Sequence, residues 1–281
     1  MGSPTNFALE YALASHPGQL RPLNEDAIGA RTDLGLFVLC DGLGGYNAGE
    51  IAATMAVSSL LSTLADDYEQ AQAAGIAFDP RKALAARMIE MDGVISRAAA
   101  NSAAFEGMAT TIVIAWILGD RLWVAHAGDS RLYRFRAGVL EALTRDHSFS
   151  QELLDAGMVT EAEARVLPSK NLVTRALGAG GDGEPEVNDY PLRVGDVLML
   201  CSDGLTEMID DVQIAGAIFA SVPDVHRAAQ RLVDMANAAG GRDNVSVIVV
   251  RLAGRKGLEP RRISVAEGRL SDTQPAASPS G

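Results

Sequence analysis

The chain has 281 residues, of which 48% are hydrophobic, so it can bury a substantial core and is not globally disordered. Its 24 basic and 36 acidic residues give a net charge of −12, which argues against a nucleic-acid-binding protein with a basic surface. An anionic substrate stays compatible with this charge, because a bound metal ion can invert the local electric field.

The cysteines and the apolar runs indicate the cellular setting. Cys40 and Cys201 form no CxxC pair and each lies in an apolar run, so we expect two small core residues, although an intramolecular disulfide stays open. Residues 1–9 lack the basic and apolar regions of a leader, and the longest apolar run, 108–119, is shorter than the roughly 18 residues of a membrane span. We expect a cytoplasmic monomer with no membrane partner.

The first half of the chain is predicted to form a buried strand, two long helices and several short strands. The apolar run 34–40 predicts the strand, and the spacing of apolar residues over 48–68 predicts the first helix. Asp79 as a cap and Pro80 at the first position predict a second helix that ends near Ala104. The short strands are expected over 110–118, 121–127 and 131–135, with tight turns between them.

The second half predicts two further strands with a pair of helices between them. The strands cover 196–201 and 245–252, and the helices cover 212–220 and 223–239. The strand over 245–252 is almost continuously β-branched, as expected of a central strand that is covered on both faces. Hairpins and paired helices favour antiparallel sheets layered with helices over a doubly wound parallel sheet.

Two segments are predicted to lie outside this core. The polar stretch 149–170 carries a short helical pattern over 151–156 and is interpreted as a flap-like surface insert. From residue 254 the composition shifts to Arg, Ser, Pro and Ala, so 254–281 is expected to be a disordered tail.

Five short segments place an aspartate among small or turn residues, four of them beside a predicted strand. These segments are 24–26, 41–45, 128–131, 202–204 and 242–244. Each alone is most often a simple turn, and 41–45 lacks the spacing and the lysine of a nucleotide-binding loop. As a set they indicate an oxygen-ligand pocket for hard cations, because carboxylates at strand ends are the ligands that such cations prefer.

In this order the segments resemble the PP2C-like (PPM) family of metal-dependent serine/threonine protein phosphatases, in its bacterial branch. The matching segments read RPLNED from residue 21, CDGLGG from 40, ATT from 109, AHAGDSR from 125, LTRDHS from 143, VTRALG from 173, LCSDGL from 200 and RDNVS from 242. The resemblance implies an α+β fold, a four-layer α-β-β-α sandwich of two antiparallel sheets flanked by helix pairs. It also implies that residues 1–253 form one phosphatase domain.

The resemblance further implies a centre of two or three Mn²⁺ or Mg²⁺ ions. Asp41 would bridge two ions, and Asp203 and Asp243 would complete the first site. The backbone carbonyl of Gly42 and the side chain of Glu25 would serve the second site, partly through water. All of these ligands are oxygens, which suits hard cations better than Zn²⁺.

The same resemblance assigns the reacting groups around the metal ions. Asp26 would orient the attacking water, and Arg21 would clamp the substrate phosphate with its planar donor fork. Asp129, together with Asp203, would hold the more weakly bound third ion. Many eukaryotic members carry a histidine as general acid where this chain has Leu43, so a different proton donor, such as a metal-bound water, must serve here.

The resemblance implies hydrolysis of phosphoserine and phosphothreonine in proteins by a metal-activated water, opposing a cognate Ser/Thr kinase. One alternative is a catalytically silent relative that binds phosphoproteins as a regulatory module, but the intact carboxylates and Arg21 argue against it. Another is a phosphatase for small phosphorylated regulators of transcription factors, for which the chain shows no sensor domain.

The four histidines are interpreted mainly as structural residues. His126 is expected to be packed and hydrogen-bonded in the core, and His226 to lie on the surface of a helix. His147 fits a loop role and a substrate contact equally well, and His16 could border the phosphate site. We expect no histidine to have a partner at metal-ligand spacing.

Overall fold

The computed structural model describes residues 4–44, 48–164, 166–167, 172–180 and 185–255, and the structural statements below refer to these residues. Most of the predicted tail over 254–281, and four positions of the insert over 149–170, therefore lie outside the described residues.

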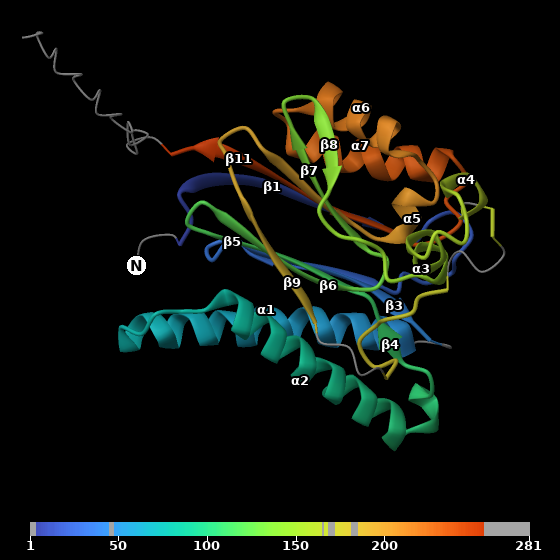
Figure 1. Ribbon diagram of the computed structural model, residues 1–281, viewed down its shortest axis with the longest axis horizontal. Helices are drawn as coiled ribbons and strands as arrows, with labels where there is room; N and C mark the ends of the chain where they lie inside the picture. Colours follow the sequence, from blue (N-terminus) through green and yellow to red (C-terminus); the bar gives the residue numbers. More distant parts are fainter. Residues whose placement is uncertain (1–3, 45–47, 165, 168–171, 181–184, 256–281) are drawn as a thin grey trace, which may run out of the picture.

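The molecule consists of two antiparallel sheets packed face to face, with a helix pair on each outer face (Figure 1). The first sheet has the order β1 (Phe7–His16), β11 (Val245–Gly254), β10 (Val197–Cys201), β7 (Arg131–Arg136) and β8 (Val139–Ala142). The second sheet has the order β2 (Asp26–Arg31), β3 (Leu36–Leu43), β5 (Ile112–Leu118), β6 (Arg121–Ala127) and β9 (Glu186–Pro191), and β4 (Ala109–Thr110) pairs with β3. The predicted four-layer α+β sandwich is confirmed.

Two helix pairs cover these sheets. α1 (Ala48–Ala74) and α2 (Pro80–Asn101) lie on the second sheet, and α6 (Asp211–Ser221) and α7 (Val225–Ala238) lie on the first (Figure 1). The short helices are η1 (Ala103–Phe105), α3 (Phe149–Asp155), α4 (Glu161–Ala164) and α5 (Asp203–Thr206). The predicted cap of α2 is confirmed, since the Asp79 side chain accepts a hydrogen bond of 3.2 Å from the backbone N–H of Lys82.

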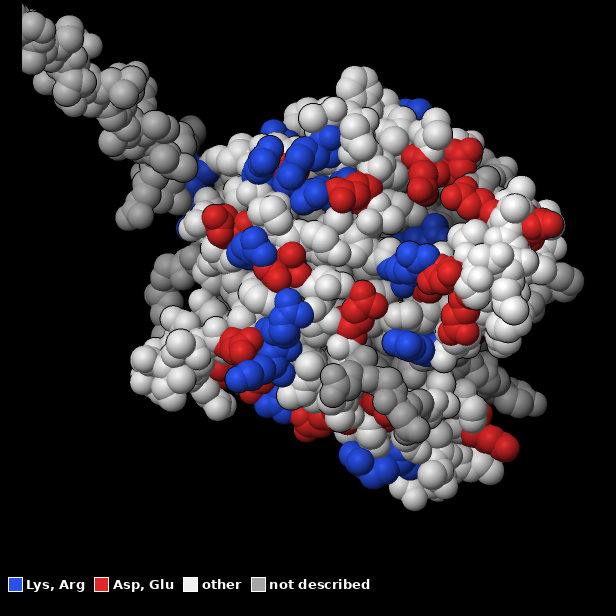
Figure 2. Space-filling model, in the orientation of Figure 1, with Lys and Arg blue, Asp and Glu red and all other residues white. Residues whose placement is uncertain are grey.

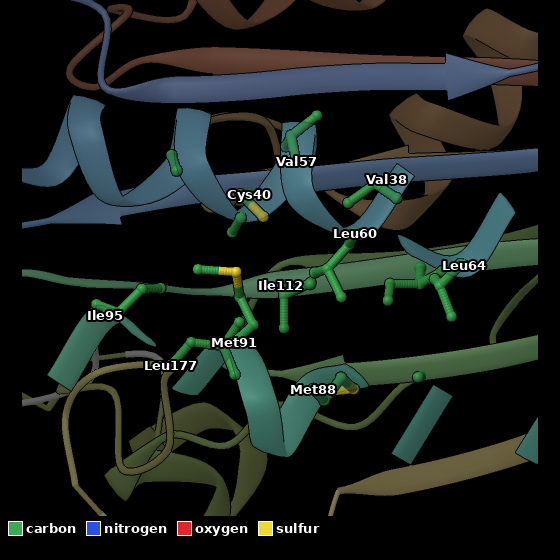
Figure 3. Packing of buried hydrophobic residues seen from close by; sticks show 14 of the residues in the cluster. Val38, Cys40, Val57, Leu60, Leu64, Met88, Met91, Ile95, Ile112 and Leu177 are labelled. Carbon is green, nitrogen blue, oxygen red and sulfur yellow. The ribbon is translucent and has the colours of Figure 1, made fainter. Parts of the chain in front are cut away.

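Three apolar layers hold the sandwich together, one between the sheets and one under each helix pair. Figure 3 shows side chains of α1, α2 and the second sheet, among them Leu60, Met88 and Ile112, packed in the layer between the helices and that sheet. In β11, Val249 faces α7 while Ile248 faces the other sheet, which explains why this central strand is apolar throughout. Each such buried side chain contributes about 1.5–3 kcal/mol to stability.

α1 is the one described helix that is long and apolar enough to cross a membrane by length and composition. Half of its most apolar window is buried inside the fold, and Leu60 and Leu64 pack against the second sheet. These contacts are those of a core helix.

Candidate metal centre

The predicted acidic residues come together where the ends of strands from both sheets meet. Asp26 begins β2 and pairs directly with Asp41 near the end of β3. Asp203 is the first residue of α5, two positions after β10, and Asp243 lies two positions before β11. These carboxylates lie close enough to repel one another, which contributes to the raised pKa values of Asp26 and Asp41.

Two glycines allow the ligand-bearing segments to approach backbone to backbone. A Cβ atom on Gly42 would lie 2.3 Å from the carbonyl carbon of Gly49 and 2.7 Å from the backbone oxygen of Glu25. A Cβ atom on Gly204 would lie 1.9 Å from the backbone oxygen of Asn244. Only glycine fits at either position, because real Cβ atoms do not approach other atoms so closely.

The Asn244 side chain fixes the loop that carries Arg21 and Glu25. Its Oδ1 accepts a hydrogen bond of 2.7 Å from the Glu25 backbone N–H, and its Nδ2 donates to the backbone oxygens of Pro17 (3.0 Å) and Leu23 (2.8 Å). Asn244 is only 5% exposed. Asn244 belongs to one of the sequence motifs, but its role could not be predicted because its partners lie more than 200 positions away along the chain.

Two threonines hold the backbone of Asp41. The Asp41 N–H donates to Thr111 Oγ1 at 3.0 Å, and Thr110 Oγ1 donates to the Asp41 carbonyl oxygen at 2.8 Å. The Thr111 hydroxyl also lies 2.8 Å from Ser130 Oγ, beside Asp129. The segment 109–111 therefore links two of the predicted ligands, a role that sequence reasoning missed.

The buried carboxyl groups are held in an unfavourable electrostatic setting. Burial, together with repulsion from neighbouring carboxylates, raises the pKa of Asp26 and Asp129 to about 7 and that of Asp203 to about 6. Burial and four neighbouring aspartates also raise the pKa of Asp41 well above its usual value, and burial raises that of Glu25. Such a cluster of like charges favours bound protons or bound cations.

Two buried oxygens at this site have no hydrogen-bond partner among the described residues, Glu25 Oε1 and Asp26 Oδ1. The other oxygen of Asp26, Oδ2, accepts a 2.8 Å hydrogen bond from the Ser202 hydroxyl. An unsatisfied buried polar atom costs about 1–3 kcal/mol, and a ligated cation or its water would remove that cost. The unpaired oxygens and the all-oxygen donor set therefore fit a hard divalent cation.

Arg21 and Asp129 lie at the edges of the carboxylate cluster. The Arg21 guanidinium donates to Asp243 Oδ2 at 2.6 Å, yet its side chain is 53% exposed. The Asp243 carboxylate raises the pKa of Arg21. Asp129 is 8% exposed and follows Gly128, whose φ of +110° and close approach to Thr111 require a glycine.

The comparisons with known proteins agree with this geometry. A family model described as protein phosphatase 2C matches residues 19–242. The chain belongs to the protein phosphatase 2C family. The predicted family is thus confirmed, whereas the exact domain boundaries at 1 and 253 stay a prediction.

Curated relatives of this phosphatase 2C chain come from several bacteria. It is 37% identical over 245 residues to the serine/threonine protein phosphatase PstP of Mycobacterium tuberculosis, covering 86% of this chain and 45% of PstP. It is 33% identical over 251 residues to the protein phosphatase PhpP of Streptococcus pneumoniae, covering 87% of this chain and 98% of PhpP. The chain thus spans about half the length of PstP and nearly all of PhpP.

Solved structures of phosphatase 2C proteins share the fold. The M. tuberculosis PstP/Ppp structure has a TM-score of 0.78 and 36% identity, covering 87% of this chain and 99% of that one. The PstP catalytic domain in complex with two manganese ions has a TM-score of 0.76 and 35% identity, covering 87% and 98%. The predicted enzyme class, protein serine/threonine phosphatase, is the class that these relatives carry, and the silent alternative is not favoured.

The structure confirms two of the predictions for the histidines of this phosphatase 2C chain. His126 is 2% exposed with Nε2 2.8 Å from the Arg145 backbone oxygen, and His226 is exposed on α7, both as predicted. His16 Nδ1 accepts a 3.0 Å hydrogen bond from the Gly18 N–H, a local turn contact. The spacing of the histidines along the chain gave no sign of a metal-ligand group, yet residues 126, 147 and 186 meet in the fold through pairing of β6 with β9 and a loop that packs on them.

Proposed function

We propose that this chain hydrolyses phosphoserine and phosphothreonine in proteins, with Mn²⁺ or Mg²⁺ as cofactor, and opposes a Ser/Thr kinase. The observation that carries the proposal is the set of buried carboxylates from both sheets with two unsatisfied oxygens among them. The relatives named serine/threonine protein phosphatases support the same reaction class.

Most of the carboxylates would bind a pair of metal ions, and Asp129 would bind a third ion. Asp41, Asp203 and Asp243 would hold the first ion, and Asp41, the Gly42 carbonyl and Glu25 the second. The two manganese ions in the PstP structure support a pair as the resident cofactor. When bound, such cations lower the pKa of a ligated water and neutralise charge on a phosphoryl group.

Asp129 would contribute to a third ion, shared with Asp203. The closeness of the two carboxylates supports this pairing, because burial and repulsion from Asp203 raise the pKa of Asp129. Both Mn²⁺ and Mg²⁺ suit such oxygen ligands.

Asp26 would position the attacking water and accept its proton. Ser202 donates to Asp26 Oδ2, and the Ser246 backbone N–H donates to Ser202 Oγ at 3.0 Å, so this side of the carboxylate is fixed. The unpaired Oδ1 is then free to accept a hydrogen bond from water.

Arg21 would bind the substrate phosphate at the rim of the site. One of its N–H groups contacts Asp243, and its half-exposed guanidinium presents a planar donor fork that matches phosphate oxygens. Its attachment to the loop pinned by Asn244 keeps this fork next to the carboxylates.

The reaction is tested on the full chain with a phosphothreonine peptide and with p-nitrophenyl phosphate. We expect hydrolysis that requires added Mn²⁺ or Mg²⁺, and a loss of about 10³-fold or more in kcat/KM for Asp203→Asn. Asp120→Asn, in the exposed turn between β5 and β6, is the matched control and should retain activity. No turnover with either metal, or full activity in Asp203→Asn, would contradict the proposal.

Leu43 lies at the end of β3, at the position where the resemblance implies a general-acid histidine in many eukaryotic members and an apolar residue in many bacterial ones. Leu43→His is expected to change the pH–rate profile for a phosphothreonine peptide, a poor leaving group, by up to about 10²-fold at its optimum. With p-nitrophenyl phosphate, whose leaving group needs no proton, the change should be much smaller. Equal pH–rate profiles of both proteins on the peptide would show that a histidine here donates no proton.

The type of partner and the cellular compartment are proposed from the surface charge and the cysteines. Figure 2 shows acidic and basic side chains interspersed over the face in view. This mixed surface and the net charge of −12 favour a protein partner over a nucleic acid. Cys40 and Cys201 are both buried and free, as predicted, which suits a reducing compartment such as the cytoplasm. The monomeric state and the signalling partner kinase stay predictions.

A further inference from the structure

We propose that His126, His147 and Glu186 form a second metal site, distinct from the carboxylate centre, for a transition-metal ion of the Zn²⁺ type. One ligand atom from each residue lies within 4.8 Å of the others. Two imidazoles and one carboxylate form a ligand set that Zn²⁺ takes in proteins, whereas Mg²⁺ and Ca²⁺ select oxygens.

Two neighbouring strands and one loop bring the three residues together. His126 on β6 lies directly opposite Glu186 on the edge strand β9, so their side chains share one face of the sheet. His147, in the loop before α3, stacks on His126 with ring centroids 4.6 Å apart and an angle of 11° between planes. The side chain of Glu186 is 43% exposed, which gives an ion a route from solvent.

The groups around the cluster resemble the outer shell of a metal site. His126 Nε2 donates to the Arg145 carbonyl oxygen at 2.8 Å, which fixes the ring and leaves Nδ1 with a lone pair. The Asn188 side-chain amide donates to Glu186 Oε1 at 2.8 Å. The second oxygen, Oε2, is turned toward His147 Nε2 at 3.6 Å, too far for a hydrogen bond.

Metal binding requires a modest contraction of the cluster. Zn–N distances of about 2.0–2.1 Å in a tetrahedral site place ligand atoms roughly 3.3 Å apart, so the stacked rings must turn. Rotation of the His147 and Glu186 side chains must supply this movement, because hydrogen bonds to Gly128 and Thr174 hold the His147 backbone. Burial lowers the pKa of His147, which favours the neutral ring that binds metals.

A metal ion bound at this second site would affect the carboxylate centre through one hydrogen bond to the backbone. His147 Nδ1 accepts a 3.3 Å hydrogen bond from the Gly128 N–H, and Gly128 precedes Asp129. A metal on Nε2 leaves the ring proton on Nδ1, where it can no longer accept from Gly128. The loaded site therefore changes the support of the turn that carries Asp129.

The test is a Co²⁺ titration of the full chain in saturating Mg²⁺, which fills the oxygen sites. We expect one equivalent of Co²⁺ to produce the intense visible absorption of four-coordinate cobalt, and Zn²⁺ to remove it. Glu186→Gln and His147→Gln should each weaken Co²⁺ binding at least tenfold. His226→Gln and Glu106→Gln, a distant histidine and a distant exposed glutamate, are matched controls and should bind normally.

Asp41→Asn separates this site from the carboxylate centre, because it removes a predicted ligand of that centre alone and should leave the Co²⁺ absorption unchanged. Circular dichroism of the Gln variants checks that they are folded. Equal Co²⁺ affinity in all five variants, or binding without the four-coordinate absorption, would overturn the proposal.

Discussion

Gly204→Ala is expected to lower kcat/KM by about 10²-fold or more and to destabilise the protein by at least about 2 kcal/mol. The added methyl group would lie 1.9 Å from the backbone oxygen of Asn244, so the Asp203 and Asp243 segments must move apart. A displacement of about 1 Å in an active site costs on the order of 10²-fold in rate, and overpacking costs about 1–3 kcal/mol. Steady-state kinetics and thermal melting measure both effects.

Gly216 provides the matched control, since it also lies in a helix but has no atom within 4 Å of the position of a Cβ. Gly216→Ala should stabilise the protein by about 0.5–1 kcal/mol and leave kcat/KM unchanged. If Gly204→Ala melted and turned over like the Gly216 variant, the close packing of the two ligand segments would be wrong.

Strands with a distinctive local composition could be predicted from the sequence. Strands that form only because they pair with a stronger neighbouring strand could not. The continuous apolar runs of β5 and β11 predict strands by themselves. β1 reads FALEYALASH and β2 reads DAIGAR, both rich in residues with low strand propensity, and neither was predicted. Each is placed by a full ladder with a stronger partner, β11 for the first and β3 for the second.

The candidate site shows the same division. The aspartates could be named from sequence because each lies in a short motif in or within two residues of a strand, and the order of these motifs resembles that of the family. The supporting contacts of Asn244, Thr110 and Thr111 could not, because they join residues 69 to 227 positions apart. The cluster of His126, His147 and Glu186 was missed for the same reason, since spacing along the chain says nothing about which loop returns to which strand.

Without metal ions, the protein is expected to become more stable as the pH falls from about 8 to 5.5. The folded-state pKa of Asp26 and Asp129 is about 7 and that of Asp203 about 6, all above the unfolded value near 3.8. The folded state therefore binds more protons than the unfolded state in this range, and stability rises as these groups are protonated. His147, whose pKa is lowered by burial, acts in the opposite direction within this range, and carboxylates with lowered pKa values, such as Asp33, do so at lower pH.

Comparison with Asp26→Asn isolates the contribution of one of these groups. With a raised pKa of about 7, Asp26 should make the chelated wild type lose on the order of 2 kcal/mol between pH 5.5 and 8, or about 4–8 °C in Tm, relative to this variant. Saturating Mg²⁺ should reverse the trend in the wild type, because the cation binds the deprotonated carboxylates and competes with protons. A Tm difference between the chelated proteins that does not change with pH would show that Asp26 carries no electrostatic strain, and the carboxylate cluster would then lack the charge repulsion that favours cation binding.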